Sequence, residues 1–101
     1  MNYRSTLRQQ TKILEQKFKD QCIIAQDGGL FLTNPELLAT LKHINETNQW
    51  VLDINQRPIM INNIDSFYKQ AYNVYYTALS EYGILLAQLN SQRSVETILD
   101  L

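Results

Sequence analysis

Hydrophobic positions in the first twenty residues follow the spacing of one helix face. Leu7, Leu14 and Phe18 stand at positions i, i+7 and i+11, and most residues between them are Arg, Lys, Gln or Glu, which favour helix. The pattern predicts an amphipathic helix within residues 1–21. Because its apolar stripe is narrow, this helix requires another surface to pack against.

Residues 22–33 have a different pattern, in which two apolar runs flank Asp27-Gly28-Gly29. These three residues tolerate the positive φ angles of a tight turn, so the segment favours a short β-hairpin. A second interpretation stays open at this point. The first helix would then continue to about Ala25, and Gly28 would form its C-cap.

A second helix is predicted to run to about Glu46, and its start has two interpretations. Thr33 and Glu36 fit a capping box. In the alternative, Asn34 is the N-cap and Pro35 takes the first helical position, which needs no amide hydrogen. The expected buried face consists of Leu37, Leu38, Leu41 and Ile44.

A second hairpin is predicted around Asn55-Gln56-Arg57-Pro58, which is rich in turn-forming residues. The flanking segments 50–54 and 59–61 consist mainly of β-branched, aromatic and other apolar residues. Pro58 has no amide hydrogen to donate, so we expect it at the start or the edge of a strand.

The most regular pattern lies in residues 63–92, where apolar columns repeat every seven residues. Two columns form an a/d seam over four heptads and predict a long helix capped by Asn63. One column holds Ile64, Ala71, Ala78 and Leu85, and the other holds Tyr68, Tyr75, Tyr82 and Leu89. A third column widens the apolar face beyond one two-stranded seam, and its members are Tyr72, Leu79 and Leu86.

This long helix does not fit inside a small globule. About 29 helical residues measure roughly 43 Å, whereas a 100-residue globule is roughly 30 Å across. Part of the helix is therefore expected to project, to kink or to pack on another chain. Gly83 costs about 1 kcal/mol relative to alanine and would mark a bend or a close helix crossing. Residues 93–101 are expected to form a short amphipathic tail.

Composition narrows the class of protein. The chain has 101 residues, of which 45% are hydrophobic and 19% charged, and this is typical of a single globular domain. One cysteine excludes an internal disulfide, and one cysteine with one histidine excludes a Cys/His zinc site. No apolar run reaches the roughly 18 residues of a membrane span, so we expect a soluble, cytoplasmic protein. The predicted fold is helix-dominated α+β, in the order helix, hairpin, helix, hairpin, long C-terminal helix.

The net charge of −1 conceals an uneven distribution. Residues 1–20 carry five basic and two acidic side chains, whereas residues 21–101 carry four basic and eight acidic ones. The basic first helix supports an alternative hypothesis of a nucleic-acid-associated replication or transcription accessory protein. Its candidate nucleic-acid contacts are Arg4, Arg8, Lys12 and Lys19.

Catalytic chemistry has few candidate residues. His43 is the only imidazole, and it lies late in the second predicted helix, where histidine commonly interacts with the helix dipole. Cys22 lies in an apolar stretch without a neighbouring base, and phosphate-loop, dinucleotide and nucleophile motifs are absent from the sequence. We therefore expect a protein that is not an enzyme, with no cofactor and no metal.

The tyrosine spacing in the long helix leads to the main functional hypothesis. A tyrosine ring buries apolar surface and keeps its hydroxyl at the rim, which suits a core or a protein interface. We expect a protein partner or a homo-oligomer that contacts this helix. The expected interface residues are Tyr68, Tyr72, Tyr75, Tyr82, Leu79, Leu86 and Leu89.

Two features resemble proteins of tailed bacteriophages. The tail is similar to the clamp-binding tails of phage replication and late-transcription accessory proteins, and its candidate partner-binding residues are Val95, Ile98 and Leu99. The whole chain resembles small accessory or virion proteins, through its small size, its many Asn, Gln, Ile and Tyr residues, and the run from Asp53 to Asp65 that leads into the Tyr-rich helix. The resemblance implies a non-enzymatic assembly protein of the host cytoplasm or the virion.

Overall fold

The structure is a computed structural model that describes residues 3–44 and 49–99, with side chains between residues 6 and 92. It is helix-dominated, 65% helical, with two small antiparallel hairpins, as the sequence predicts. The elements in chain order are α1 (Tyr3–Gln21), β1 (Ile23–Gln26), β2 (Gly29–Leu32), α2 (Pro35–His43), β3 (Trp50–Leu52), β4 (Pro58–Met60) and α3 (Ile64–Leu99).

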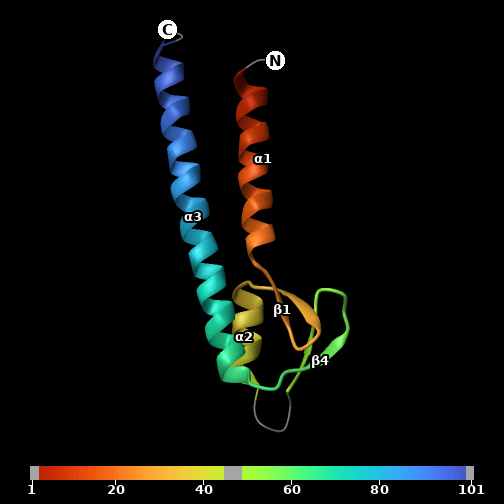
Figure 1. Cartoon of the computed structure of the whole chain (residues 1–101). Helices are drawn as coiled ribbons and strands as arrows, with labels where there is room; N and C mark the ends of the chain where they lie inside the picture. The colour runs from red at the N-terminus through yellow and green to blue at the C-terminus, as the bar shows by residue number, and fades with distance from the viewer. Residues whose placement is uncertain (1–2, 45–48, 100–101) are drawn as a thin grey trace.

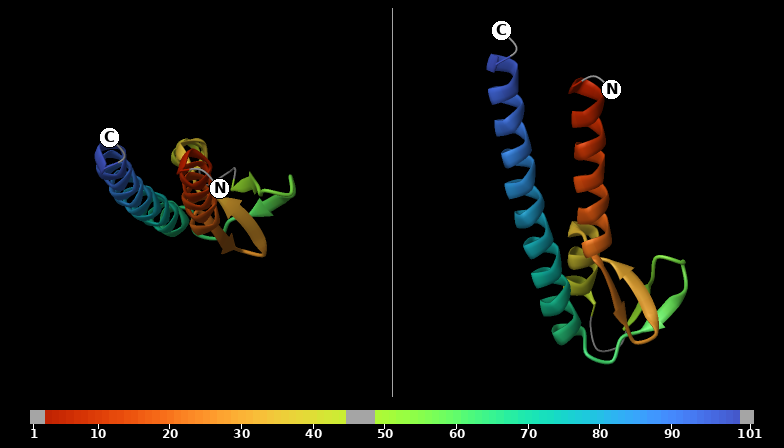
Figure 2. Two further views of the ribbon diagram at one scale, coloured as in Figure 1. Left: turned by 90° about the horizontal axis from the view of Figure 1, so that it is seen from above. Right: turned by 45° about the horizontal axis from the view of Figure 1, so that its top comes forward.

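The molecule consists of a two-helix stalk and a small head (Figure 1). Helices α1 and α3 run side by side in opposite directions, so that both ends of the chain lie at the far end of the stalk (Figure 2). The head holds α2 and the two hairpins. The molecule measures 64 × 21 × 16 Å, with a radius of gyration of 18.3 Å. A globule of this length would have a radius of gyration of about 13 Å, so the chain is markedly elongated.

The first hairpin pairs Ile23 with Leu32 and Gln26 with Gly29. Its two-residue turn has positive φ angles at Asp27 (50°) and Gly28 (85°), which is the backbone of a type I′ turn. The hairpin interpretation of residues 22–33 is therefore confirmed, and the helix-extension alternative is wrong. The first helix ends at Gln21 instead.

Helix α2 begins with the second of its two predicted caps. The Leu37 amide donates to Asn34 Oδ1 at 2.7 Å, and Pro35 takes the first helical position. Thr33 is buried instead, where its hydroxyl donates to the Cys22 carbonyl oxygen at 2.8 Å. The helix ends at His43, before the expected Glu46, and residues 45–48 lie outside the described part of the chain.

The second hairpin alternates between bonded and non-bonded residue pairs. Its bonded pairs include Asp53 with Arg57, in which the Asp53 amide donates to the Arg57 carbonyl oxygen at 3.0 Å. The pair of Leu52 and Pro58 lies between bonded pairs, so no ladder hydrogen bond requires the missing amide of Pro58. Pro58 is the first residue of β4, as predicted.

One apolar core holds the head together and contacts the base of α3. Phe31 from β2 and Phe67 from α3 meet edge to face, with ring centroids 5.0 Å apart. Around them lie the other buried members of the core, Leu38, Leu41, Val51, Ile61 and Ala71. The first hairpin, α2, the second hairpin and α3 therefore share one hydrophobic cluster.

Helix α3 is longer than the sequence analysis predicts. It continues to Leu99, so residues 94–99 extend the helix instead of forming a separate tail. The reason is local, because no glycine or proline follows Gly83 and the residues after Gln92 include Arg93, Glu96 and Leu99, which favour helix. In the described chain, no helix is both long enough and apolar enough to span a membrane.

Candidate interaction surfaces

The outer face of the two hairpins is apolar and exposed. In antiparallel pairing, opposite residues point to the same face, so a hairpin with one buried face normally presents polar residues on the other. Here the inner face supplies Phe31 and Val51 to the core, and the outer face is also hydrophobic. We call this face the outer surface, and it consists of Ile23, Leu30, Leu32, Trp50, Leu52, Ile54 and Met60.

The seven side chains of the outer surface are 38–58% exposed, with Leu32 the least exposed and Leu52 the most exposed. The two hairpins that carry them are joined at their neighbouring edges. The Ile54 amide donates to the Leu30 carbonyl oxygen at 2.8 Å. Both inner faces pack on the same core, where Gly29 of the first hairpin lies against Ile59 of the second.

Asp53 ties the two hairpins together from inside. It is 3% exposed, and its Oδ1 accepts the Asn55 and Arg57 amides at 2.9 and 3.0 Å. Its Oδ2 accepts the Leu30 amide at 3.4 Å, across to the first hairpin. The Arg57 guanidinium Nη2 lies 3.3 Å from the same oxygen. The Arg57 amide and these other donors lower the pKa of Asp53, so the carboxylate is charged at neutral pH.

A groove of about 600 Å³ opens where the two hairpins diverge. It lies between β2, the first turns of α2 and β3, and its lining includes Leu32, Trp50 and Leu52. Leu52 belongs to a non-bonded pair of its hairpin, so its backbone N–H and C=O point away from β4. The groove therefore combines apolar side chains with backbone groups at a strand edge.

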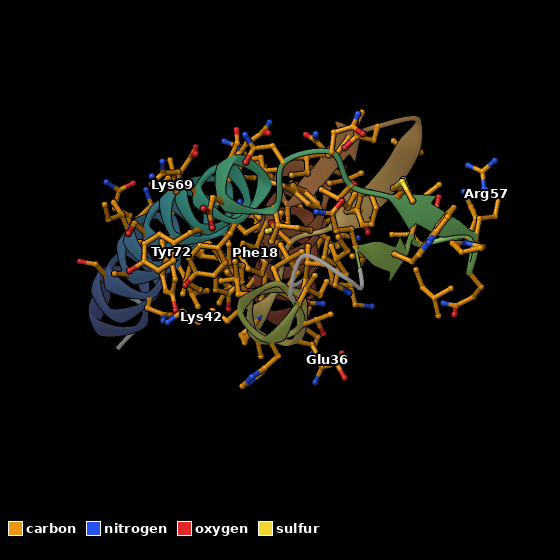
Figure 3. All side chains as sticks on the ribbon, turned by 90° about the horizontal axis from the view of Figure 1, so that it is seen from below. Phe18, Glu36, Lys42, Arg57, Lys69 and Tyr72 are labelled. Atoms are coloured by element: carbon orange, nitrogen blue, oxygen red, sulfur yellow. The ribbon has the colours of Figure 1, made fainter. Side chains whose placement is uncertain are left out.

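The aromatic residues of α3 form a connected chain of rings. From Tyr75, ring centroids are separated by 5.0 Å to Tyr76, then by 4.6 Å to Tyr72 and by 6.1 Å to Tyr68. The Lys42 ammonium of α2 lies 5.6 Å from the Tyr68 centroid, within the range of a cation–π contact. In Figure 3, Lys42 and Tyr72 lie far from Arg57, which projects from the second hairpin.

Phe18 connects this aromatic chain to α1. Its ring stacks on Tyr82 at 5.1 Å and lies 6.1 Å from Tyr75. Next to it, Lys17 Nζ and Glu81 Oε1 form an ion pair at 3.0 Å. The hydrogen bond from Lys17 is the largest cause of the lowered pKa of Glu81. Phe18 and Lys17 therefore fasten α1 to the middle of α3.

The predicted interface residues divide into two groups. Tyr68, Tyr75 and Tyr82 are half-buried by neighbours within the chain, and Leu89 is buried. Tyr72 and Leu79 are exposed, at 46% and 38%. Leu86 is half-buried. The structure therefore separates one set of α3 side chains that packs inside the molecule from a second set on its surface.

The candidate nucleic-acid contacts lie along α1. Arg8, Lys12 and Lys19 are exposed, and the side chain of Arg4 lies outside the described part. Lys17, between them in sequence, is neutralised by Glu81. The side chains of the tail residues Val95, Ile98 and Leu99 also lie outside the described part, although their backbone is helical.

His43 and Cys22 are the residues with the most evident catalytic or ligand chemistry. His43 is exposed at the end of α2. Cys22 is 1% exposed, and burial raises the pKa of its thiol. Among the described residues, no group of three or more His, Cys, Asp or Glu side chains is placed to bind a metal ion.

Comparisons of the chain with protein-family models, with curated proteins and with solved structures found no match. The candidate surfaces therefore rest on geometry alone. Sequence reasoning found the exposed Tyr72 and Leu79 but missed the outer surface. A signal for it was present, because residues 30–32 and 50–52 are apolar at every position, where a hairpin with one solvated face would alternate.

Proposed function

We propose that this chain is a non-enzymatic assembly protein, which binds a protein partner through the outer surface of its hairpins. A place in a phage virion or a phage accessory complex fits this proposal, in line with the resemblance of the sequence. The observation that carries the proposal is the outer surface itself: seven large apolar side chains on the outer faces of the two hairpins, each 38–58% exposed.

The size of the outer surface supports binding. Complete burial of a large apolar side chain contributes about 1.5–3 kcal/mol, and roughly half of this remains to be gained for each half-exposed residue. Seven such residues supply about 5–10 kcal/mol before the cost of association, which is several kcal/mol. Contiguous exposed apolar patches of this kind are typical of sites for protein partners.

The outer surface is also held in a fixed geometry. Phe31 and Val51 anchor its two hairpins in the core, and Asp53 bonds both hairpins. A preformed surface loses little conformational entropy on binding, which leaves more of the burial energy for affinity. Trp50, at 54% exposed, provides the kind of aromatic side chain that often dominates binding energy.

The proposal is tested by affinity purification from the cells that produce the protein, with quantitative mass spectrometry. We expect wild-type protein to retain a stoichiometric partner, and the double variant Leu32→Ser, Leu52→Ser to lose it. Ile84→Ser is the matched control, because Ile84 is 60% exposed but lies on α3, outside the outer surface. Retention of the partner by the double variant, or its loss from the control, would contradict the proposal, and circular dichroism verifies that each variant folds.

A further inference from the structure

Helix α3 carries a second heptad seam, which is mostly exposed in the described chain and of which Leu86 is half-buried. Tyr72, Tyr76, Leu79, Gly83 and Leu86 are spaced by four, three, four and three residues, which places them on one side of the helix. Members of this exposed seam directly follow residues that face α1, as Tyr76 follows Tyr75 and Gly83 follows Tyr82. The exposed seam is therefore rotated by about 100° around the helix axis from the side that faces α1. Tyr72, Tyr76 and Leu79 are 46%, 43% and 38% exposed.

Gly83 stands in the exposed seam without a role inside the molecule. A Cβ atom added there would meet no described atom within 4 Å. A glycine in the middle of a helix costs about 1 kcal/mol relative to alanine, and no contact within the described chain compensates for this cost at Gly83. A glycine at this position lets the backbone of another helix approach α3 closely.

The side of α3 that carries the exposed seam is also uncharged. Between Gln70 and Gln92, Glu81 is the only charged residue. Glu81 lies on another side of the helix, where it accepts from Lys17 and Gln21 of α1. A helix side that faces water normally carries charged residues, so this composition is that of a surface covered in use.

We propose that the exposed seam binds a second copy of this chain, with the two α3 helices antiparallel and crossing at Gly83. Leu79 precedes Gly83 by four residues and Leu86 follows it by three, so the seam has nearly the same pattern in both directions. A two-fold axis at Gly83 therefore places Leu79 of each copy against Leu86 of the other. Such a self-complementary patch is what a two-fold dimer requires.

The stalk is large enough for this dimer. The stretch of α3 that begins at Tyr72 and is symmetric about Gly83 ends at residue 94, which gives a length of about 33 Å at 1.5 Å per residue. With the smaller cross-section of the molecule, 16 Å, as the width of the contact, each copy buries about 530 Å². The total of about 1,050 Å² lies just above the roughly 1,000 Å² that a biological interface should exceed.

An antiparallel dimer places the two heads at opposite ends. If the outer surface binds a partner, as proposed above, the dimer is a connector with one binding surface at each end. This consequence rests on the proposed function, but the dimer itself does not.

The test is analytical ultracentrifugation over micromolar concentrations, with three variants. We expect wild-type protein to dimerise, and Leu79→Gln and Gly83→Leu to weaken dimerisation by at least about tenfold, equal to about 1.4 kcal/mol. Ile84→Gln is the matched control and should dimerise like wild type, because Ile84 lies off the exposed seam. Gly83→Leu should also keep or raise the melting temperature of the monomer, because its side chain enters open space and favours helix.

Orientation is tested by disulfide cross-linking with the buried Cys22 left in place. In an antiparallel dimer, position 76 of one copy lies near position 90 of the other, so a mixture of Tyr76→Cys and Asn90→Cys proteins should form the mixed cross-link. Tyr76→Cys alone should not cross-link. A monomer at every concentration, a dimer insensitive to Leu79→Gln and Gly83→Leu, or a cross-link of Tyr76→Cys with itself would overturn the inference. Failure of partner binding through the outer surface would instead overturn the proposed function alone.

Discussion

Gly29 is the position where a single added methyl group most directly tests how the two hairpins fit together. It lies buried on the inner face of β2, opposite Ile59 of β4. A Cβ atom at Gly29 would be 2.6 Å from Ile59 Cγ1, and 3.1 Å from both Ile59 Cδ1 and Phe31 Cε2. The first of these separations is far below van der Waals contact, so either Ile59 or the whole second hairpin must move.

We expect Gly29→Ala to destabilise the protein by about 1–3 kcal/mol, the usual cost of overpacking a well-packed site. Ile59→Ala alone should cost about 1–3 kcal/mol, less than a fully buried isoleucine, because Ile59 is half-buried. In the double variant the clash with Ile59 disappears, and only the close contact with Phe31 remains. Its total cost should therefore be clearly smaller than the sum of the two single costs.

The assay is urea unfolding followed by far-UV circular dichroism, analysed as a double-mutant cycle. Gly28→Ala serves as the control, because Gly28 has φ of +85° and open space around its Cβ position. Its cost, about 1–2 kcal/mol, comes from the left-handed backbone and should add to that of Ile59→Ala. Additivity within about 0.5 kcal/mol for Gly29→Ala with Ile59→Ala would refute the inter-hairpin contact.

Three further predictions concern the head and the stalk. The pKa of Asp53 is lowered in the folded state, so its carboxylate stabilises the fold above the ordinary carboxyl range, and this stabilisation is lost as the pH falls through the folded pKa. Asp53→Asn should therefore reduce the loss of stability at acid pH in a curve of unfolding free energy against pH. An unchanged loss of stability at acid pH would contradict this. Asn34→Ala should lower the free energy of unfolding by about 1 kcal/mol through loss of the α2 cap, whereas Asn34→Asp should retain most of it in urea unfolding. Cys22 is buried with a raised thiol pKa, so a thiol reagent should modify it much more slowly in native protein than in urea, and equal rates would show that the β1 end opens freely.

Local sequence determined most of the secondary structure. The Asp27-Gly28 turn, the Asn34-Pro35 start of α2 and the first residue of β4 at Pro58 all follow from backbone rules that involve only a few neighbouring residues. The heptad columns of α3 likewise follow from the spacing of side chains along one helix. These rules do not depend on what the element packs against, so the order of helices and hairpins is readable from the sequence.

Tertiary structure decided which apolar side chains are buried. In residues 30–32 and 50–52 every position is apolar, so the alternation that separates an inner from an outer face is missing. Only the placement of Phe31 and Val51 against α2 and α3 reveals that their neighbours form the outer surface. In α3, likewise, several columns are apolar, and the position of α1 determines that Tyr82 is covered while Tyr72 is exposed.

Asp53 shows the same limit for a polar residue. Its sequence neighbourhood indicates only a turn, and its contact with Leu30 crosses 23 positions of the chain. A carboxylate that joins two hairpins is defined by partners distant in sequence, and so is the outer surface that it supports. Element type therefore depends on local backbone and spacing rules, whereas burial and exposure depend on which faces meet when the elements pack.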